Sequence, residues 1–445
     1  MGLVHAKDVT PNPQGSRLNL DQVKARVDKV KIEGLGRTKD DILTDKVQEL
    51  FKAKDFQEVI LGAHKVRSKL ESLECFSKVG VLIDTSEGPD ATPDGYQVVF
   101  QVKELKRIAG SVKTLMGNNE GSLVVELKAP NMFGRGEKIT AEYSRGWNRT
   151  IGLSTTFYKP LRVLNNTSLS TSIFQQGSEW MRSGYKLIER GMLLDLAFNS
   201  NTSLRHNLQW EGSWRELECL TRSTSFLVRE QNGHSLKCSV RHIAEYDKRD
   251  AAVFPSSGSF FKLIQEFAGL GGDIGFLKNE LHFQNNISLM SDVVLQTSVQ
   301  CGLLNHVNNS KTSKICDKFF LGGPLSLRGF DWRGVGPHDQ GNSLGGEFFW
   351  AGGLHLFSPL PFRPGGGGFG DLFRTHIFIN GGNITASSSD PYDYFRNIRI
   401  AYGIGVALRL GQVARVELNY CVPISAQKYD HICPGVQLGV GLSFL

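Results

Sequence analysis

Residues 436–444 read Val436-Gln437-Leu438-Gly439-Val440-Gly441-Leu442-Ser443-Phe444, so apolar side chains alternate with polar or very small ones. Because successive side chains of a strand point to opposite faces, this stretch predicts a strand that is apolar on one face only. The stretches 400–410 and 414–422 show the same alternation. Together the three predict strands of a sheet with a large apolar face.

Alternating stretches of this kind follow one another from residue 118 onwards, and we count about sixteen, an even number inside the range of membrane barrels. No helix-like stretch after residue 118 is long enough to cover the apolar face of such a sheet. That face must meet a second sheet, as in a soluble sandwich, or lipid, and the length of the strands favours lipid. We therefore predict an all-β transmembrane barrel of about sixteen antiparallel strands over residues 118–445.

The composition agrees with a barrel and argues against a helical membrane protein. The chain has 445 residues, of which 40% are hydrophobic and 49 are glycine. Its longest apolar runs fall far short of the roughly 18 residues that a spanning helix needs, whereas barrel strands expose only alternate residues to lipid. The net charge of +7 comes without a run of Lys or Arg, so nucleic acid is not an expected partner.

Cysteine usage and the first residues bear on the compartment. The seven cysteines are odd in number and no two have the C-x-x-C spacing, which argues against a disulfide framework and against a zinc site. Free thiols favour a chain made in a reducing cytosol. Residues 1–6 lack the apolar core of a secretory signal. We therefore expect the barrel in an organelle rather than in the bacterial envelope.

The N-terminal part of the chain has a different periodicity. Residues 1–24 contain Pro11, Pro13 and Gly15 and predict a flexible lead. Residues 25–106 predict a small α/β domain with the element order β-α-α-β-β. Its expected elements are a strand over 26–32, a helix that follows an N-cap at Thr38, a helix over 55–75, and strands over 79–85 and 96–104.

A long connection without alternation, about residues 303–342, separates two of the predicted barrel strands. Loops of that length are uncommon and usually functional. This one contains Leu327-Arg328-Gly329-Phe330. The tetrapeptide resembles the hallmark of the superfamily of outer-membrane assembly barrels with polypeptide-transport-associated (POTRA) domains. The hallmark is an Arg-Gly-Phe/Tyr tip on a long loop that folds back into the barrel lumen.

The resemblance suggests partners for the loop in the lumen. In the strand that follows, alternation places Glu347 on the lumen face, opposite Phe348 and Trp350. Because an unpaired charge in a crowded lumen is costly, we predict that Arg328 pairs with Glu347. A second acid often stands one strand later in the superfamily, but this chain has Asn380 there. Asn380 is therefore predicted as a hydrogen-bonding partner without charge.

Two further stretches narrow the resemblance. Residues 121–127, followed by Pro130-Asn131-Met132-Phe133-Gly134-Arg135-Gly136, resemble the first barrel strand and hairpin of the superfamily. Gln437, Gly439, Leu442 and Phe444 fit the mitochondrial β-signal, a polar residue, a glycine and two hydrophobic residues at set spacing. From residue 25 onwards the chain is most similar to the central barrel subunits of the mitochondrial sorting and assembly machinery. The small domain is then a single POTRA domain.

The resemblance implies an insertase that folds β-barrel precursors into the mitochondrial outer membrane by templated strand pairing at a lateral gate. The gate would lie between the last strand, with its β-signal residues, and a first strand carrying Gly121, Leu123, Val125 and Leu127. The N-terminal domain would face the intermembrane space. The implied partners are the lipid bilayer, barrel precursors, accessory subunits of the machinery and an inner-membrane cristae-organising complex. The role needs no catalytic residue, cofactor or metal, so we do not expect an enzyme.

Two rival functions remain open on the residues alone. A sixteen-stranded barrel could be a passive pore, although a pore needs neither a POTRA-like domain nor a long lumen loop. The stretch from Gly341 to Gly345 fits the G-x-S-x-G pattern of a hydrolase with Ser343 as nucleophile. That pattern requires a preceding strand and a following helix, whereas here a loop precedes it and a strand follows.

Overall fold

The computed structural model describes residues 23–87, 89, 91–117, 120–147, 149–161, 167–290, 292–307, 311–360, 368–386, 391–411, 414–442 and 444–445. The chain divides into two compact units, residues 1–107 with 129–137 and residues 108–128 with 138–445. All but the last two residues of the predicted flexible lead, 1–24, lie outside the described residues. No helix in the described part of the chain has the length and apolar character needed to cross a membrane.

The N-terminal domain has the predicted order β-α-α-β-β, with one additional 3-10 turn. Its elements are β1 (Arg26–Glu33), α1 (Asp41–Val47), η2 (Gln48–Lys52), α2 (Phe56–Glu71), β2 (Phe76–Thr85) and β3 (Gly95–Glu104). The sheet order is β1-β3-β2, with β1 parallel and β2 antiparallel to the central strand.

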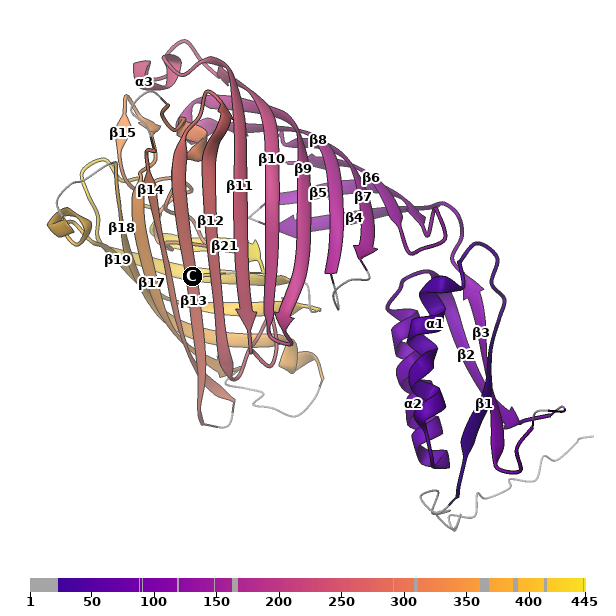
Figure 1. Ribbon diagram of the computed structural model, residues 1–445. Coiled ribbons are helices and arrows are strands. Elements are labelled where there is room, and N and C mark those ends of the chain that lie inside the picture. Colours follow the sequence, from indigo (N-terminus) through magenta and orange to yellow (C-terminus); the bar gives the residue numbers. More distant parts are fainter. Residues whose placement is uncertain are drawn as a thin grey trace, which may run out of the picture. The chain divides into compact units, whose positions relative to one another are not determined.

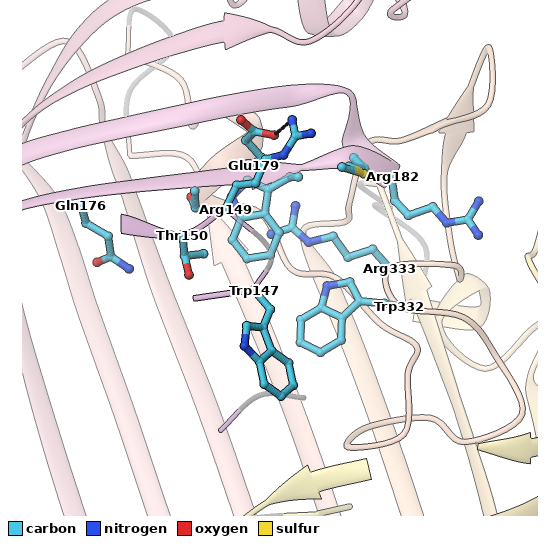
Figure 2. Close-up of a pocket in the computed structure, with 11 residues that line it drawn as sticks. Trp147, Arg149, Thr150, Gln176, Glu179, Arg182, Trp332 and Arg333 are labelled. Atoms are coloured by element: carbon cyan, nitrogen blue, oxygen red, sulfur yellow. Dashed lines mark hydrogen bonds and ion pairs between the residues drawn. The ribbon is translucent and has the colours of Figure 1, made fainter. Parts of the chain in front are cut away.

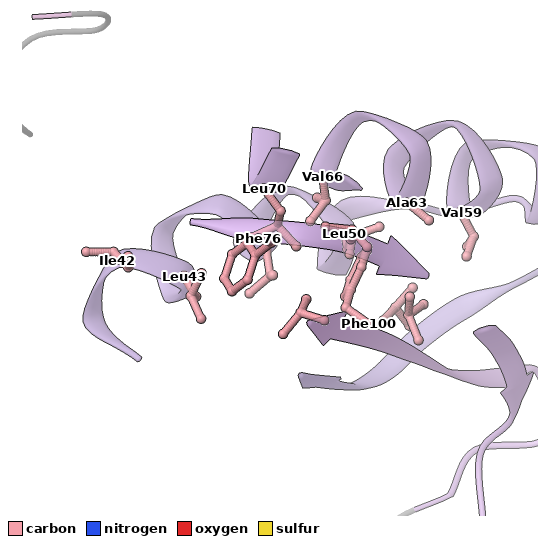
Figure 3. Packing of buried hydrophobic residues seen from close by; sticks show 14 of the residues in the cluster. Ile42, Leu43, Leu50, Val59, Ala63, Val66, Leu70, Phe76 and Phe100 are labelled. Carbon is pink, nitrogen blue, oxygen red and sulfur yellow. The ribbon is translucent and has the colours of Figure 1, made fainter. Parts of the chain in front are cut away.

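The core of this domain follows from the periodicity of α2. Val59, Ala63, Val66 and Leu70 recur every three or four residues and are buried, as expected for the apolar stripe of a helix that packs on a sheet. Figure 3 shows them together with other buried residues of the domain, among them Phe100 of β3. Burial of this stripe attaches the helix to the sheet.

One detail of the domain differs from the prediction. The helix α1 begins at Asp41 with Asp40 in the N-cap position, where the Asp40 side chain makes no capping hydrogen bond, so the predicted N-cap at Thr38 is wrong. The Thr38 hydroxyl instead donates to Glu104 Oε1 at 2.7 Å, from the end of β3. A carboxylate distant in the sequence thus competes successfully for a hydroxyl that sequence spacing assigns to the helix.

In the described part of the second unit, sixteen strands form one sheet in which each strand lies beside the next strand of that sheet along the chain, and Figure 1 shows this sheet curling round. The predicted all-β barrel is confirmed. Its strands are β4 (Ala109–Gly117), β5 (Glu120–Pro130), β6 (Lys138–Gly146), β7 (Ile151–Leu161), β8 (Thr167–Trp180), β9 (Tyr185–Asn201), β10 (Leu204–Cys219), β11 (Gly233–Asp247), β12 (Gly258–Gly272), β13 (Phe276–Met290), β14 (Val293–Asn305), β17 (Phe348–Pro359), β18 (Phe373–Thr385), β19 (Arg399–Leu410), β20 (Ala414–Ser425) and β21 (Gly435–Gly441).

The strands near the C-terminus have the two faces that their alternation predicts. On β20, Leu418 and Tyr420 are exposed, whereas Glu417, Asn419 and Cys421 are buried. An exposed apolar face and a polar interior are the reverse of a soluble protein and typical of a membrane barrel. The lumen is therefore the place where charged side chains gather.

The barrel begins one strand earlier than predicted. The first strand is β4, which pairs with β5 from Ala109↔Lys128 to Gly117↔Glu120, so the predicted start at residue 118 is wrong. The register places Gly110, Val112 and Thr114 on the same face as the apolar residues of β5. Because glycine and threonine interrupt the apolar side of β4, its alternation is weak in the sequence.

Candidate functional site: the lumen loop and the strand seam

The connection between β14 and β17, residues 306–347, is the long loop that the sequence predicted at about 303–342. It contains η4 (Ile315–Asp317) and the short strands β15 (His338–Asp339) and β16 (Asn342–Ser343). Leu327, Arg328 and Phe330 at its tip are fully buried. Apolar loop residues share one core with barrel residues: Leu321, Leu327, Phe330, Val335, Ala351, Ala401 and Leu445. The loop therefore packs inside the barrel.

The Arg328 guanidinium occupies a closed polar site beside the last strands. Its Nη2 lies 2.8 Å from Glu417 Oε2 on β20, and both side chains are 0% exposed. Its Nη1 donates to the main-chain oxygen of Leu445 at 3.0 Å. Arg415 Nε lies 2.9 Å from the other carboxylate oxygen of Glu417, so Glu417 is shared by two arginines. A buried carboxylate is costly without an opposite charge, and here two guanidinium groups lie within 3 Å of it.

The predicted pairing of Arg328 with Glu347 is therefore wrong. Glu347 Oε1 lies 3.1 Å from His306 Nε2 and 3.4 Å from Lys318 Nζ. Glu347 has the parity of the lumen face but stands at the end of β17, where the loop leaves the sheet. The tip instead reaches Glu417 on β20. The alternation of β20 had already placed Glu417 among its polar positions, so the signal was present in the sequence.

Asn380 on β18 contacts the loop through the backbone rather than through the guanidinium. With its amide oriented to match its neighbours, its oxygen accepts from the N–H of Arg328 at 2.7 Å and its nitrogen donates to the Ala401 carbonyl at 2.8 Å. An uncharged residue suits this role, because the partner is a neutral peptide group. The tip of the loop is thereby fixed to β18.

The remaining tip residues are bound to β21. Gly329 N–H donates to Gln437 Oε1 at 2.9 Å, and Gln437 Nε2 donates to the Phe330 carbonyl at 3.1 Å. Gly329 has a φ of +86°, and a Cβ there would lie 2.8 Å from the Cβ of Ala401. The predicted β-signal residue Gln437 is therefore a lumen residue that binds the loop.

The last residues leave the sheet, so the predicted strand through Phe444 is too long. β21 ends at Gly441, and the buried Phe444 ring packs on the lumen face, where its Cε1 lies 3.0 Å from the position of a Cβ on Gly439. The guanidinium of Arg415 lies 4.3 Å from the centre of the same ring. Leu442, in contrast, is exposed. The glycines of β21 thus make room for the ring.

The residues predicted for the first strand of the gate lie on the second strand of the sheet. Gly121, Leu123, Val125 and Leu127 lie on β5, which pairs with β4 along its length. The ends of the sheet are β4 and β21, and Cα atoms of these two strands come within 8 Å. Among the described residues no backbone pairing joins β4 to β21. We call the junction of these two edge strands the seam.

Other contacts fix the loop to the strands β8 to β10, and sequence patterns gave no sign of them. Arg215 on β10 lies 2.7 Å from both Asp317 Oδ1 of the loop and Glu189 Oε1 of β9. The Arg333 guanidinium lies 3.6 Å from the ring centre of Trp180 and 3.7 Å from that of Phe320. Figure 2 shows Arg333 and Trp332 at a cavity of about 640 Å³ that turns of the barrel also line. The loop is therefore held on two sides.

Comparisons with known proteins show the family of this chain. A family model for the Omp85 superfamily domain matches residues 131–444. The chain is 45% identical to the sorting and assembly machinery component 50 homolog of Xenopus tropicalis, over 100% of both chains. This chain belongs to the component 50 family of the Omp85 superfamily. Component 50 relatives also include the human homolog, 44% identical over 100% of both chains, and a SAM50-like protein of Drosophila melanogaster, 37% identical over 97% of both.

The fold of this component 50 family member also matches a solved structure. BamA from Haemophilus ducreyi lacking POTRA domains 1–3 gives a TM-score of 0.77 at 19% identity, with 94% of this chain and 84% of that chain covered. At that identity the match supports the fold. In the parts of the chain that the structure describes, no group of three or more His, Cys, Asp or Glu side chains is placed to hold a metal ion.

Proposed function

We propose that this component 50 family member folds and inserts β-barrel precursors into the mitochondrial outer membrane, using the β4–β21 seam as a lateral gate. The observation that carries the proposal is the seam itself, where two edge strands approach each other beside the buried tip of the lumen loop. The relatives are named components of a sorting and assembly machinery, which supports an assembly role in a complex with accessory subunits.

Edge strands in lipid explain how such a gate would act. Unpaired backbone N–H and C=O groups are costly in a bilayer, and an exposed edge is a template for another strand. A terminal strand of a precursor can pair with β4 by β-augmentation, and each further strand then pairs with the one before it. The precursor never exposes a long unpaired edge, and no covalent step, cofactor or metal is needed.

The two edge strands of the proposed gate are held by different contacts. Loop residues Arg328 and Gly329 bind Glu417 and Gln437 on the last two strands. These contacts steady the β21 side. The strand β4 has a backbone partner on its β5 side, and the loop contacts just described do not reach it. In the proposed cycle β21 therefore keeps its position, and β4 is the strand that moves.

The insertase proposal also implies where the sheet and the N-terminal domain lie. The exposed apolar face of the sheet lies in the outer-membrane bilayer, and the N-terminal domain faces the intermembrane space, where it meets arriving precursors. A contact with an inner-membrane cristae-organising complex belongs to the same proposal, since the domain would lie on that side. These placements can be tested by protease protection of a tag fused ahead of residue 23.

The first test is depletion of the protein from mitochondria, followed by import of a labelled porin precursor and native gel electrophoresis. The proposal expects the precursor to cross the outer membrane and stall before its mature complex, while helical outer-membrane proteins insert normally. The rival function is a passive pore. Normal porin assembly with reduced metabolite flux would replace the insertase by the pore.

A further inference from the structure

The turn between β5 and β6 belongs to the N-terminal unit although it joins two barrel strands. Residues 129–137 are grouped with residues 1–107, whereas the flanking strands 108–128 and 138–146 belong to the barrel unit. This turn and the last residue of β5 together contain the Pro130 to Gly136 motif that the sequence singled out. The motif has no part in the gate chemistry described so far.

Asn131 connects the turn to the domain through both ends of its amide. The side chain is 1% exposed and its φ is +52°, a conformation that Asn tolerates better than most residues. Its Oδ1 accepts from the Gly136 N–H at 2.9 Å, within the turn. Its Nδ2 donates to the Thr38 hydroxyl at 2.7 Å, in the N-terminal domain. One end of the amide shapes the turn and the other end binds the domain.

Thr38 passes this contact on to the end of β3. Its hydroxyl donates to Glu104 Oε1 at 2.7 Å, which leaves the oxygen lone pairs for Asn131. Glu104 also accepts from the backbone N–H groups of Gly36, Arg37 and Thr38 at 3.1, 3.0 and 2.9 Å. Burial raises the pKa of Glu104, but the hydrogen bonds from Thr38 and its neighbours outweigh it and lower the pKa to about 2. The carboxylate is therefore charged at neutral pH.

A second contact lies beside the first. The Lys39 N–H donates to the Gly134 carbonyl at 2.9 Å. Gly134 has a φ of +87°, and a Cβ there would lie 2.3 Å from the Arg37 carbonyl oxygen. Only glycine allows the turn to approach the domain backbone this closely. The approach therefore depends on residue types at 131 and 134 that the sequence motif supplies.

We propose that Thr38, Lys39, Asn131 and Gly134 form a latch that makes the N-terminal domain a positioning element for the first barrel hairpin. The turn continues directly into β5, and β5 holds the edge strand β4 along its length. Movement of the domain is thereby transmitted to the strand that the proposed function assigns to the client. This role of the latch rests on the proposed function, whereas the existence of the latch does not.

Two substitutions open the latch while leaving the turn intact. Asn131→Asp keeps the oxygen that accepts from Gly136 but loses the donor to Thr38 and places a carboxylate near Glu104. Thr38→Val removes the hydroxyl from the domain side at nearly constant volume. Thr38→Ser keeps the hydroxyl and is the matched control. Asn131→Ala is less useful, because it removes the bond within the turn as well.

Residue-resolved hydrogen exchange of the full chain in lipid nanodiscs reports on the latch directly. The Lys39 amide, which donates to Gly134, should exchange about tenfold faster in Asn131→Asp and Thr38→Val, and at the wild-type rate in Thr38→Ser. The Met132 amide, which donates to the Glu137 carbonyl within the turn, should keep its wild-type rate in all three. Unchanged exchange at Lys39 in both opened variants overturns the latch.

The same variants test what the latch does for assembly. Insertion of a porin precursor by mitochondria that carry each variant should slow severalfold for Asn131→Asp and Thr38→Val, and should be normal for Thr38→Ser. Normal insertion with an open latch would show a local packing contact and overturn the positioning role. If the wild-type protein does not insert precursors, the proposed function fails while the exchange result at Lys39 still stands.

Discussion

Glu417→Gln tests the charge arrangement at the loop tip. The substitution keeps the shape of the side chain but leaves Arg328 and Arg415 without the carboxylate that lies 2.8 and 2.9 Å from them. Removal of one partner from a buried ion pair costs about 3–5 kcal/mol. Arg328 retains its bond to the Leu445 main-chain oxygen, so we expect a loss near the lower end of that range.

The loss can be measured as the change in free energy of unfolding in urea, followed by the fluorescence of the six tryptophans in the full chain. Glu347→Gln is the matched control, because Glu347 pairs with His306 and Lys318 at the end of β17 and its loss should cost about 1 kcal/mol or less. Equal losses for the two variants would refute the assignment of Glu417 as the partner of Arg328.

A double substitution separates the pair from its surroundings. Arg328→Met with Glu417→Gln removes both charges, so it should recover part of the stability lost in Glu417→Gln alone. Arg328→Ala alone should impair barrel stability or precursor assembly, since it leaves Glu417 with Arg415 and opens a cavity at the tip. If Arg328→Ala left both quantities at the wild-type value, the buried tip would have no role in holding the C-terminal strands.

Gly329→Ala should destabilise the barrel by about 1–3 kcal/mol, because its Cβ would lie 2.8 Å from the Cβ of Ala401; addition of Ala401→Gly should recover part of the loss in urea unfolding. Glu104, whose pKa is lowered to about 2, contributes stability that is fully present above its ordinary value of about 4.5 and is lost as the pH falls towards 2. The protection factor of the Thr38 amide, which compares its exchange rate with that of an unstructured peptide at the same pH, should therefore fall over that window, and Glu104→Gln should abolish this pH dependence. Gly439→Val should displace the Phe444 ring and slow porin assembly on native gels, whereas Leu438→Val on the exposed face should not.

The alternation of side chains predicted the barrel well because lipid and lumen impose opposite requirements on successive residues. The alternating stretch at 414–422 became β20 (Ala414–Ser425) with little error. The edge strands were predicted less well. β4 was missed because Gly110 and Thr114 interrupt its apolar face. β21 is shorter than predicted because Phe444 turns into the lumen, where its ring occupies the space that a side chain at Gly439 would take.

The sequence predicts which residues face the lumen, but it predicts only in part which of them pair with the loop. Alternation places Arg415, Glu417 and Glu347 on the lumen face, but it does not say how far an infolded loop reaches along the barrel axis. Proximity in sequence favoured Glu347 as the partner of Arg328, and the loop reaches the more distant Glu417 instead. The contact of Arg215 with Asp317 joins residues whose separation in sequence gives no pattern at all.

The polar side chains of the loop tip fix the register of the loop against the last two strands, which lie beside the seam. An apolar tip could fill the lumen with equal stability, since a buried ion pair rarely stabilises a protein more than a hydrophobic replacement of similar volume does. A polar tip does something that apolar packing does not, because Arg328 matches Glu417 and Gly329 matches Gln437 in only one register. A shift of the loop by one residue would leave buried charges unpaired. The strand β21 has a ladder on its β20 side but none to β4 within the described residues. We infer that the contacts of the loop, rather than backbone pairing with β4, set the position of the last strand.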